Sequence, residues 1–428
     1  MTESEAGGGG AVVSGPRHAP RPMSVRRSVL VLGALSAFGP LSMDLYLPSL
    51  PSLGDDLGVN TTLAQLTMTA CTLGLGLGQI LVGPLSDKFG RRRPIILGVL
   101  LFALMSLACT VAPNIGFLVT FRFIQGLGGA AGMVVARAMV RDMYEGQALT
   151  RMFSLLMLVS GSAPIIAPIL GGQLVRVVDW RGVFLVLFGI GAALFVIALL
   201  GVKETLPKER RQTGGFRAIG VHVTTVAKDG LFVAVVLVLG CTTASFMSYI
   251  TMTSFIFQDE FGTTPTEFSI IFTINSVAIV LGSQLNGFLA RRFSSFRLLG
   301  VALAGALLAT LAVLDSAVMS APLVALCASL AAVLFFQGWV NPNTTSIAMQ
   351  DHGAHAGTAS ALLGTAQFVV GPLIGPLVSL GGASSLALGV TMVSCLALAN
   401  VLWYAVVRPI MRKRLPGTGE PEISRLVN

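Results

Sequence analysis

Residues 83–95 read GPLSDKFGRRRPI, a short basic stretch between two long apolar runs, 63–84 and 94–113. A helix that spans a bilayer needs roughly 20 apolar residues, which each run supplies. Lys88 and the arginines Arg91 to Arg93 are typical of a loop that stays on the cytoplasmic side of a membrane. The stretch therefore predicts two adjacent membrane helices joined by a basic cytoplasmic turn.

Individual residues of this stretch favour a structured turn over a merely basic loop. Gly83 allows a close approach between helices, and Gly90 permits a tight turn. Asp87 stands where its carboxylate can bond a basic side chain or the N-terminus of a neighbouring helix. Arg91 and Arg92 follow directly, so we expect an organised polar cluster at the inner ends of two helices.

Composition extends this prediction to the whole chain. Of 428 residues, 54% are hydrophobic and 11% are charged, against roughly 25% charged in soluble domains. This excludes a soluble enzyme, a disordered protein and a secreted disulfide scaffold, and the five cysteines lie in apolar runs without a CxxC pair. We expect an all-α membrane protein of twelve transmembrane helices, over residues 28–50, 63–84, 94–113, 115–140, 152–175, 182–201, 231–256, 267–290, 298–317, 321–348, 356–380 and 384–407.

The distribution of basic residues predicts the orientation. With the N-terminus inside, 24 of the 28 lysines and arginines fall in inner segments, and the outer loops hold only Arg176 and Arg181. Basic residues collect on the cytoplasmic side of membrane proteins. Both termini are therefore expected in the cytoplasm, as a disordered tail over residues 1–27 and a second tail over 409–428.

An internal repeat divides the chain into two halves. At an offset of 204 residues, Asp55-Asp56-Leu57-Gly58 falls on Asp259-Glu260-Phe261-Gly262, and further glycines and prolines also match. Parallel repeats of six spans describe the halves of a rocking transporter whose site lies between them. We expect two pseudo-symmetric six-helix bundles, 28–201 and 231–408, joined by a cytoplasmic linker over 202–230.

The stretch 83–95 closely resembles the loop signature of the major facilitator superfamily. Arg122-x-x-Gln125-Gly126 is similar to another motif of that superfamily, and Ala167-Pro168-x-x-Gly171-Gly172 resembles its antiporter motif, with alanine in place of the first glycine. Finer features resemble the Bcr/CflA drug:proton antiporters, namely MDLYLPSLP from Met43, RAMVRDMY from Arg137, DWRGVF from Asp179 and ETLP from Glu204.

The resemblance implies the major facilitator fold and a multidrug exporter. It implies a multi-pass protein of the bacterial inner membrane that exports small amphipathic drugs, such as chloramphenicol-like or related antibiotics, by alternating access. Protons and the bilayer would be its other partners, with no nucleic acid, a monomeric state, and the proton gradient in place of a cofactor. Gly83, Asp87, Gly90, Arg91 and Arg92 would serve conformational switching, and Pro168, Gly171 and Gly172 would form the antiporter helix motif.

Asp44 is the acidic residue that lies well inside a predicted span. A charge at the bilayer centre costs roughly 2.5–3.5 kcal/mol on insertion scales, so it needs a partner or a purpose. Counting from the outer ends of their runs, Asp44 and Arg122 share a depth. We therefore hypothesise that they form the proton-coupling pair. The alternative is a helix-end aspartate near the outer face, since Pro48 and Pro51 follow.

Other groups in the spans are candidates for the substrate cavity. For any one of them taken alone, an interhelical hydrogen bond or core packing is the better explanation. His352 and His355 share one short loop that supplies too few ligands, so no metal site is expected. The cavity candidates are Met43, Tyr46, Gln125, Met247, Tyr249, Phe255, Asn275 and Gln337.

A membrane-embedded enzyme and a transporter of another kind are the two alternative functions. A membrane-embedded enzyme needs several catalytic side chains at one depth, but the spans hold no histidine and one acidic residue away from their ends. A symporter or facilitator for a small metabolite would use the same fold. The chain contains no G-x-x-x-x-G-K-[ST] run, so we expect no ATP-driven transport.

Overall fold

The computed structural model describes residues 25–144, 146–211, 228–350, 359, 362–369 and 383–414, and the regular structure in these ranges is helical. Most of both predicted tails, much of the linker, and His352 and His355 lie outside the described residues. The helices of the first half are α1 (Val25–Asp44), η1 (Leu47–Ser49), α2 (Leu50–Leu57), α3 (Thr61–Phe89), α4 (Arg92–Thr110), α5 (Ile115–Met143), α6 (Gly146–Leu174) and α7 (Trp180–Gly201). After η2 (Lys208–Arg210) come α9 (Gly230–Phe255), η3 (Ile256–Glu260), α10 (Pro265–Leu289), α11 (Ser295–Val318), α12 (Leu323–Met349), α14 (Ser385–Leu402), η6 (Trp403–Val407) and α15 (Arg408–Arg414).

Ten described helical segments are long and apolar enough to cross a membrane. The predicted all-helical membrane protein is therefore confirmed, but the count of twelve spans is not. α6 is helical over the predicted fifth span, although it is not among the ten, and most of the predicted span over 356–380 lies outside the described residues.

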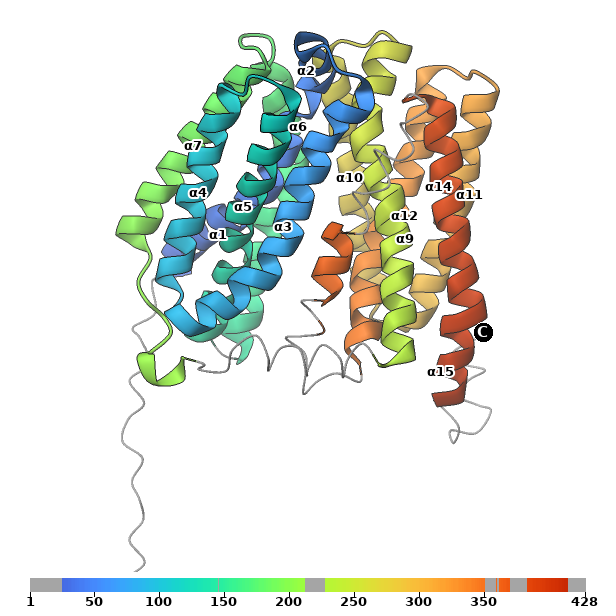
Figure 1. Cartoon of the computed structure of the whole chain (residues 1–428). Helices are drawn as coiled ribbons and strands as arrows, with labels where there is room; N and C mark the ends of the chain where they lie inside the picture. The colour runs from blue at the N-terminus through green and yellow to red at the C-terminus, as the bar shows by residue number, and fades with distance from the viewer. Residues whose placement is uncertain are drawn as a thin grey trace, which may run out of the picture.

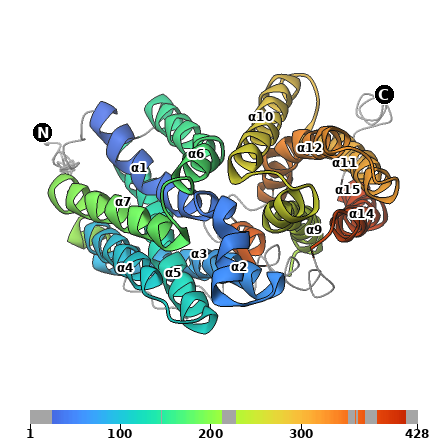
Figure 2. The same cartoon turned by 90° about the horizontal axis from the view of Figure 1, so that it is seen from above.

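The helices form two groups side by side, α1–α7 and α9–α15 (Figure 1; seen from above in Figure 2). In the first group α5 packs against α3 and α4, and α7 covers α4, while α12 packs against α10 and α11 in the second. α6 and α10 pack together where the groups meet. We call the two ends of the molecule the α2 end, at the top of Figure 1, and the α15 end, at the bottom.

The repeat in the sequence has equivalents in the structure. Gly58 and Gly262 both adopt positive φ, 61° and 66°, a conformation that only glycine takes at little cost. Near each glycine, a carboxylate accepts hydrogen bonds from the start of a later helix in the same half, α7 in the first half and α14 in the second. Asp56 accepts hydrogen bonds from Trp180 and Arg181 at α7. Glu260 accepts the backbone N–H and the hydroxyl of Ser385 at α14, at 2.8 and 2.6 Å.

The first span breaks in its middle. α1 ends at Asp44, Leu45 and Tyr46 form a bend, and helical structure resumes at Leu47 and continues to Leu57. Pro48 lacks the N–H that would continue the α-helical bonding back to the Asp44 carbonyl, which favours a break here. The predicted end of this span near residue 50 was therefore wrong, and Asp44 lies deeper below the α2 end than expected.

Candidate functional site

Asp44 lies at the broken end of α1, where it is 7% exposed. Its carboxylate forms none of the ion pairs found among the described residues. It interacts electrostatically with the phenol of Tyr249 on α9. Asp44 therefore lies within electrostatic range of a residue of the second half, near the seam where the two halves meet.

Aromatic and amide groups of the second half surround Tyr249. The Asn275 side chain donates a hydrogen bond to the Tyr249 hydroxyl at 3.2 Å. The ring of Phe272 stacks on that of Tyr249, with centroids 5.4 Å apart and planes 21° apart. Two of the predicted cavity residues, Tyr249 and Asn275, are thus in direct contact at the depth of Asp44.

Arg122 of α5 is completely buried inside the first half. Its Nη1 donates to Gln125 Oε1 at 2.7 Å, and Gln125 donates in turn to the Ser106 hydroxyl at 2.6 Å. The guanidinium carbon lies 4.4 Å from the centre of the Tyr46 ring and 5.4 Å from that of Phe184. Neutral amide and aromatic groups therefore hold this cation, because π faces attract it.

The structure does not pair Arg122 with Asp44. No described carboxylate forms an ion pair with Arg122, and its Nε has no hydrogen-bond partner among the described residues. Similar depth was the reason for expecting a pair. Asp44 lies within electrostatic range of Tyr249 on α9, whereas Arg122 lies inside the first half against the Tyr46 ring.

The remaining predicted cavity residues are buried in this conformation, and several share one apolar cluster. Met43, Tyr46, Met247, Tyr249 and Phe255 all belong to a core cluster that draws on both halves. Contact with a substrate stays a prediction for each of these residues and for Gln337, which is 8% exposed on α12.

Hydrogen bonds join the halves near the α2 end, and sequence reasoning missed them. Ser254 Oγ donates to the Leu47 carbonyl at 2.7 Å, and Gln258 Nε2 donates to the Pro48 carbonyl at 3.3 Å. The Leu47 carbonyl, just after the break, accepts the Leu50 N–H within η1 as well as the Ser254 hydroxyl of the other half. We interpret this conformation as closed at the α2 end.

The glycines of the predicted antiporter motif lie where α6 meets other helices. A Cβ on Gly171 would collide with the Leu45 carbonyl of the bend, and a Cβ on Gly172 would collide with the Ser269 side chain of α10. Pro168 is buried one turn earlier. The motif therefore permits close packing of α6 on both the broken span and the second half.

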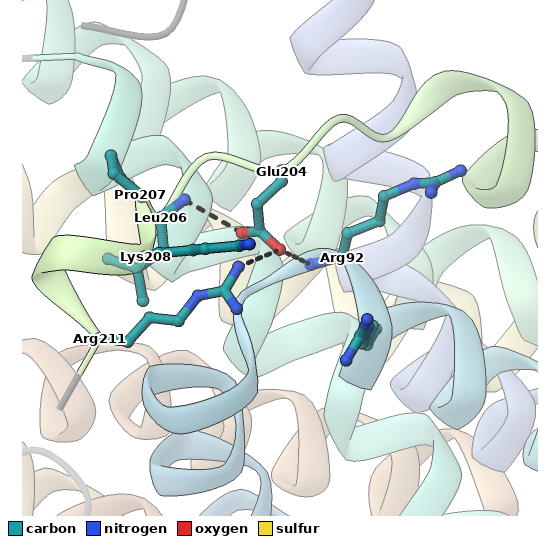
Figure 3. Close-up of a pocket in the computed structure, with 7 residues that line it drawn as sticks. Arg92, Glu204, Leu206, Pro207, Lys208 and Arg211 are labelled. Atoms are coloured by element: carbon teal, nitrogen blue, oxygen red, sulfur yellow. Dashed lines mark hydrogen bonds and ion pairs between the residues drawn. The ribbon is translucent and has the colours of Figure 1, made fainter. Parts of the chain in front are cut away.

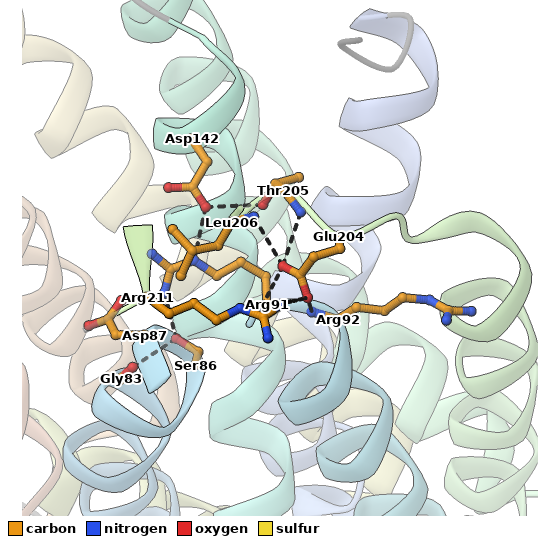
Figure 4. Close-up of polar contacts among 10 residues, drawn as sticks. All are labelled: Gly83, Ser86, Asp87, Arg91, Arg92, Asp142, Glu204, Thr205, Leu206 and Arg211. Atoms are coloured by element: carbon orange, nitrogen blue, oxygen red, sulfur yellow. Dashed lines mark hydrogen bonds and ion pairs between the residues drawn. The ribbon is translucent and has the colours of Figure 1, made fainter. Parts of the chain in front are cut away.

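The predicted switch residues form a polar cluster at the α15 end (Figure 4). Arg91 Nη1 donates to the carboxylate of Asp87 at 2.5 Å and to the hydroxyl of Ser86 at 2.8 Å. Arg91 Nε donates to Asp142 at the end of α5 at 2.9 Å. Burial lowers the pKa of Arg91, but bonds and charges from Asp142 and Asp87 outweigh it and raise the pKa above its ordinary value.

Glu204, which follows α7, completes this cluster. Its carboxylate accepts the backbone N–H of Arg91 at 2.8 Å and that of Arg92 at 3.3 Å, and so caps the start of α4. Gly90 turns the chain here with φ of 90°, and a Cβ on it would collide with Glu204. Arg92 Nη2 and Nε donate to carbonyls at the end of α7, those of Leu199 at 2.9 Å and Val202 at 3.0 Å.

The structure corrects the prediction for Gly83 and adds two carboxylates to this cluster. A Cβ on Gly83 would meet no described atom within 4 Å, so the expected close helix approach is absent among the described residues. Asp142 lies in the stretch RAMVRDMY and Glu204 in ETLP, but neither was predicted as a site residue. Both end a span on the side of the basic loop 88–93, and that shared position was the available signal.

These features define a polytopic membrane carrier with a buried carboxylate at the seam of two helical halves. A model of the Major Facilitator Superfamily matches residues 30–376. The chain is 37% identical over 383 residues to the MFS-type transporter YdgK of Bacillus subtilis, covering 88% of this chain and 94% of that protein. The chain belongs to the Major Facilitator Superfamily, as a multi-pass bacterial membrane protein.

Further relatives agree with the resemblance to the Bcr/CflA type, which is confirmed. The bicyclomycin resistance protein homolog of Haemophilus influenzae is 28% identical over 390 residues, covering 90% of this chain and 97% of that protein. Multidrug resistance protein D of Escherichia coli is 28% identical over 378 residues, covering 86% and 93%. A bacterial homolog of the human lysosomal transporter Spinster, in an inward-facing and occupied conformation, shares the fold with a TM-score of 0.73 at 16% identity, covering 93% of this chain and 100% of that one.

Proposed function

We propose that this chain exports small amphipathic drugs in exchange for protons. Relatives named for bicyclomycin and multidrug resistance support the drug as cargo. Apolar and aromatic side chains of both halves, gathered in one cluster, support an adaptable site for such compounds. We place both termini in the cytoplasm, so the α2 end faces outward and the α15 end faces the cytoplasm.

The observation that carries the proposal is the position of Asp44. This carboxylate is buried at a helix break, forms no ion pair among the described residues and lies within electrostatic range of Tyr249 in the opposite half. A charge at such a depth costs roughly 2.5–3.5 kcal/mol, and protonation removes that cost. Since the backbone at Leu45 and Tyr46 is not helical, Asp44 can be reoriented without unwinding a regular helix.

We assign Arg122 the role of a fixed positive charge. An arginine stays protonated, so Asp44 is the group that exchanges the proton. In the present conformation the Tyr46 ring lies against Arg122, and Asp44 lies near Tyr249. We propose that Asp44 is protonated here and that its charged form turns toward Arg122 in the other access state.

Alternating access needs contacts that are made in one state and lost in the other. The bonds of Ser254 and Gln258 to the bend close the outward end in this state. Asp55 and Asp259, at equivalent positions of the repeat, repel each other at the same end. We propose that the attraction of these hydrogen bonds and the repulsion of the two carboxylates nearly cancel, so that neither access state is strongly favoured. The Arg91 cluster then controls movement at the cytoplasmic end.

Everted membrane vesicles from a pump-deficient strain test the proposal. Vesicles acidified inside should accumulate a drug to which the expressing strain is resistant, because protons leave as drug enters. Asp44→Asn should abolish accumulation, whereas the matched control Asp315→Asn, an exposed carboxylate on α11, should not. Accumulation by Asp44→Asn equal to that of the unmodified protein would contradict the proposal.

The same vesicles address the alternative, a symporter or facilitator for a small metabolite. A symporter would lose substrate from vesicles acidified inside, because substrate and protons leave together. A facilitator would equilibrate substrate whatever the pH gradient. The direction of drug movement therefore separates the three functions.

A further inference from the structure

A basic pocket opens at the α15 end, away from the seam (Figure 3). It has a volume of about 420 Å³ and lies between the start of α4 and the segment that follows α7. Four of its side chains are basic and one is acidic. The lining residues are Arg92, Arg93, Glu204, Leu206, Pro207, Lys208 and Arg211.

The one carboxylate of the pocket is already engaged. Glu204 accepts the backbone N–H groups of Arg91, Thr205 and Leu206, at 2.8, 3.1 and 3.0 Å. Its ion pair with Arg211 is long, at 3.6 Å, and Arg211 Nε has no hydrogen-bond partner among the described residues. The pocket therefore keeps an excess of positive charge and an unused donor.

An exposed apolar surface runs from this pocket along the helices. Leu97 lies one turn from Arg93 on the same face of α4 and is 62% exposed. Leu200, near the end of α7, which packs against α4, is 76% exposed, and Leu104 continues the α4 stripe. In a membrane these side chains meet lipid acyl chains, so charge and apolar surface together match an amphipathic anion.

We propose that this pocket binds the phosphate of an anionic phospholipid of the phosphatidylglycerol class. Arg93 and Lys208 are exposed and supply charge at the rim, and the Arg211 guanidinium lines the pocket beside Glu204. The acyl chains lie along Leu97 and Leu200. Free phosphate would use the same cations but gain nothing from the apolar stripe.

The pocket also touches the switch cluster. Glu204 lines the pocket and caps α4 beside Arg91, so a lipid phosphate next to Arg211 stabilises the arrangement of α4 and the segment after α7. Lipid composition would thereby affect the stability of this conformation. This inference concerns the bilayer and stands whether or not drugs are the cargo.

Native mass spectrometry of the purified full-length protein tests it, by titration with phosphatidylglycerol and with phosphatidylcholine. Phosphatidylglycerol should bind more tightly. Arg93→Gln and Lys208→Gln should each weaken its binding about fivefold, because a basic residue near an anionic surface contributes about that factor. The matched control Arg291→Gln/Arg292→Gln changes two exposed arginines at the same end of the other half and should bind normally.

Thermal unfolding in detergent gives a second readout that separates lipid from free phosphate. Phosphatidylglycerol should stabilise the unmodified protein, and inorganic phosphate should not. Equal binding of the two lipids, unchanged binding by Arg93→Gln and Lys208→Gln, or equal stabilisation by inorganic phosphate would each overturn the proposal.

Discussion

Arg122 holds its guanidinium carbon 4.4 Å from the centre of the Tyr46 ring, although no described carboxylate pairs with it. Tyr46 in turn bonds the Thr67 hydroxyl at 2.6 Å, which fixes the ring on α3. The ring thus lies against the buried cation, two residues after Asp44. The bend after α1 therefore connects the carboxylate at the seam with the charge inside the first half.

Tyr46→Leu should destabilise the protein and impair export, because the buried cation loses its aromatic neighbour. The lost contact is worth up to about 2 kcal/mol when desolvated. Tyr46→Phe keeps the ring and loses only the bond to Thr67, so we expect a loss of about 1 kcal/mol and continued export. Thermal unfolding in detergent and drug export from cells are the measurements.

The control for this pair is Tyr404→Leu. Tyr404 also lies beside an arginine, 5.7 Å from Arg408, but its ring is exposed. Its removal should change stability by less than about 0.5 kcal/mol. If Tyr46→Leu were as harmless as Tyr404→Leu, the aromatic contact would have no role in holding Arg122.

Asp142→Asn should slow transport and leave drug affinity unchanged. Arg91 loses its charged bond at 2.9 Å, worth about 1.5 kcal/mol or roughly tenfold in a rate, while the proposed drug site at the seam is untouched. Transport into proteoliposomes and drug binding in detergent separate the two effects. Weaker drug binding with normal transport kinetics would contradict a switching role.

Ser254→Ala should shift the molecule toward an outward-open state. The variant loses the bond to the Leu47 carbonyl at 2.7 Å, and a loss of about 1 kcal/mol changes a population ratio roughly fivefold. Spin labels on Val111→Cys and Met319→Cys, which are exposed near the outward ends of the two halves, should show a larger share of long distances. Ser52→Ala is the control, since its hydroxyl bonds Ser49 within one half, and identical distance distributions for both variants would remove Ser254 from the closing contacts.

Gly172→Ala should lower thermal stability and export, because the added methyl group collides with Ser269 and pushes α6 from α10. Overpacking of this kind costs about 1–3 kcal/mol. Gly83→Ala meets no described atom and should leave stability unchanged or raise it slightly. Equal unfolding temperatures for the two variants would show that α6 can adjust without loss.

Much of the fold was predictable because apolar runs and basic loops report directly on membrane helices. The basic turn at 83–95 was predictable too, because Gly90 indicates a tight turn and the arginines indicate a loop on the cytoplasmic side. Contacts such as Arg91 with Asp142, or Arg91 with Glu204, join residues far apart in the chain. No local pattern gives the distance between such residues, so the sequence indicated the cluster but not its members.

The relation of Asp44 to Arg122 shows a second limit. Counting residues along a span gives depth at 1.5 Å per residue but gives no rotation about the bundle. The predicted depth of Asp44 was also too small, because the span does not end near residue 50. Helical structure resumes after the bend at Leu45 and Tyr46 and continues past the two prolines to Leu57. Depth and direction both depend on packing between helices, which one sequence does not contain.

If Asp44 couples drug export to proton entry, as we propose, drug binding must favour release of its proton. The most direct test is proton release from the purified protein in a weakly buffered detergent solution when drug is added. The unmodified protein should release protons as drug binds. Asp44→Asn should bind the drug without releasing protons, whereas Asp315→Asn should release them normally. Undiminished proton release by a folded, drug-binding Asp44→Asn protein would show that another group couples the two fluxes.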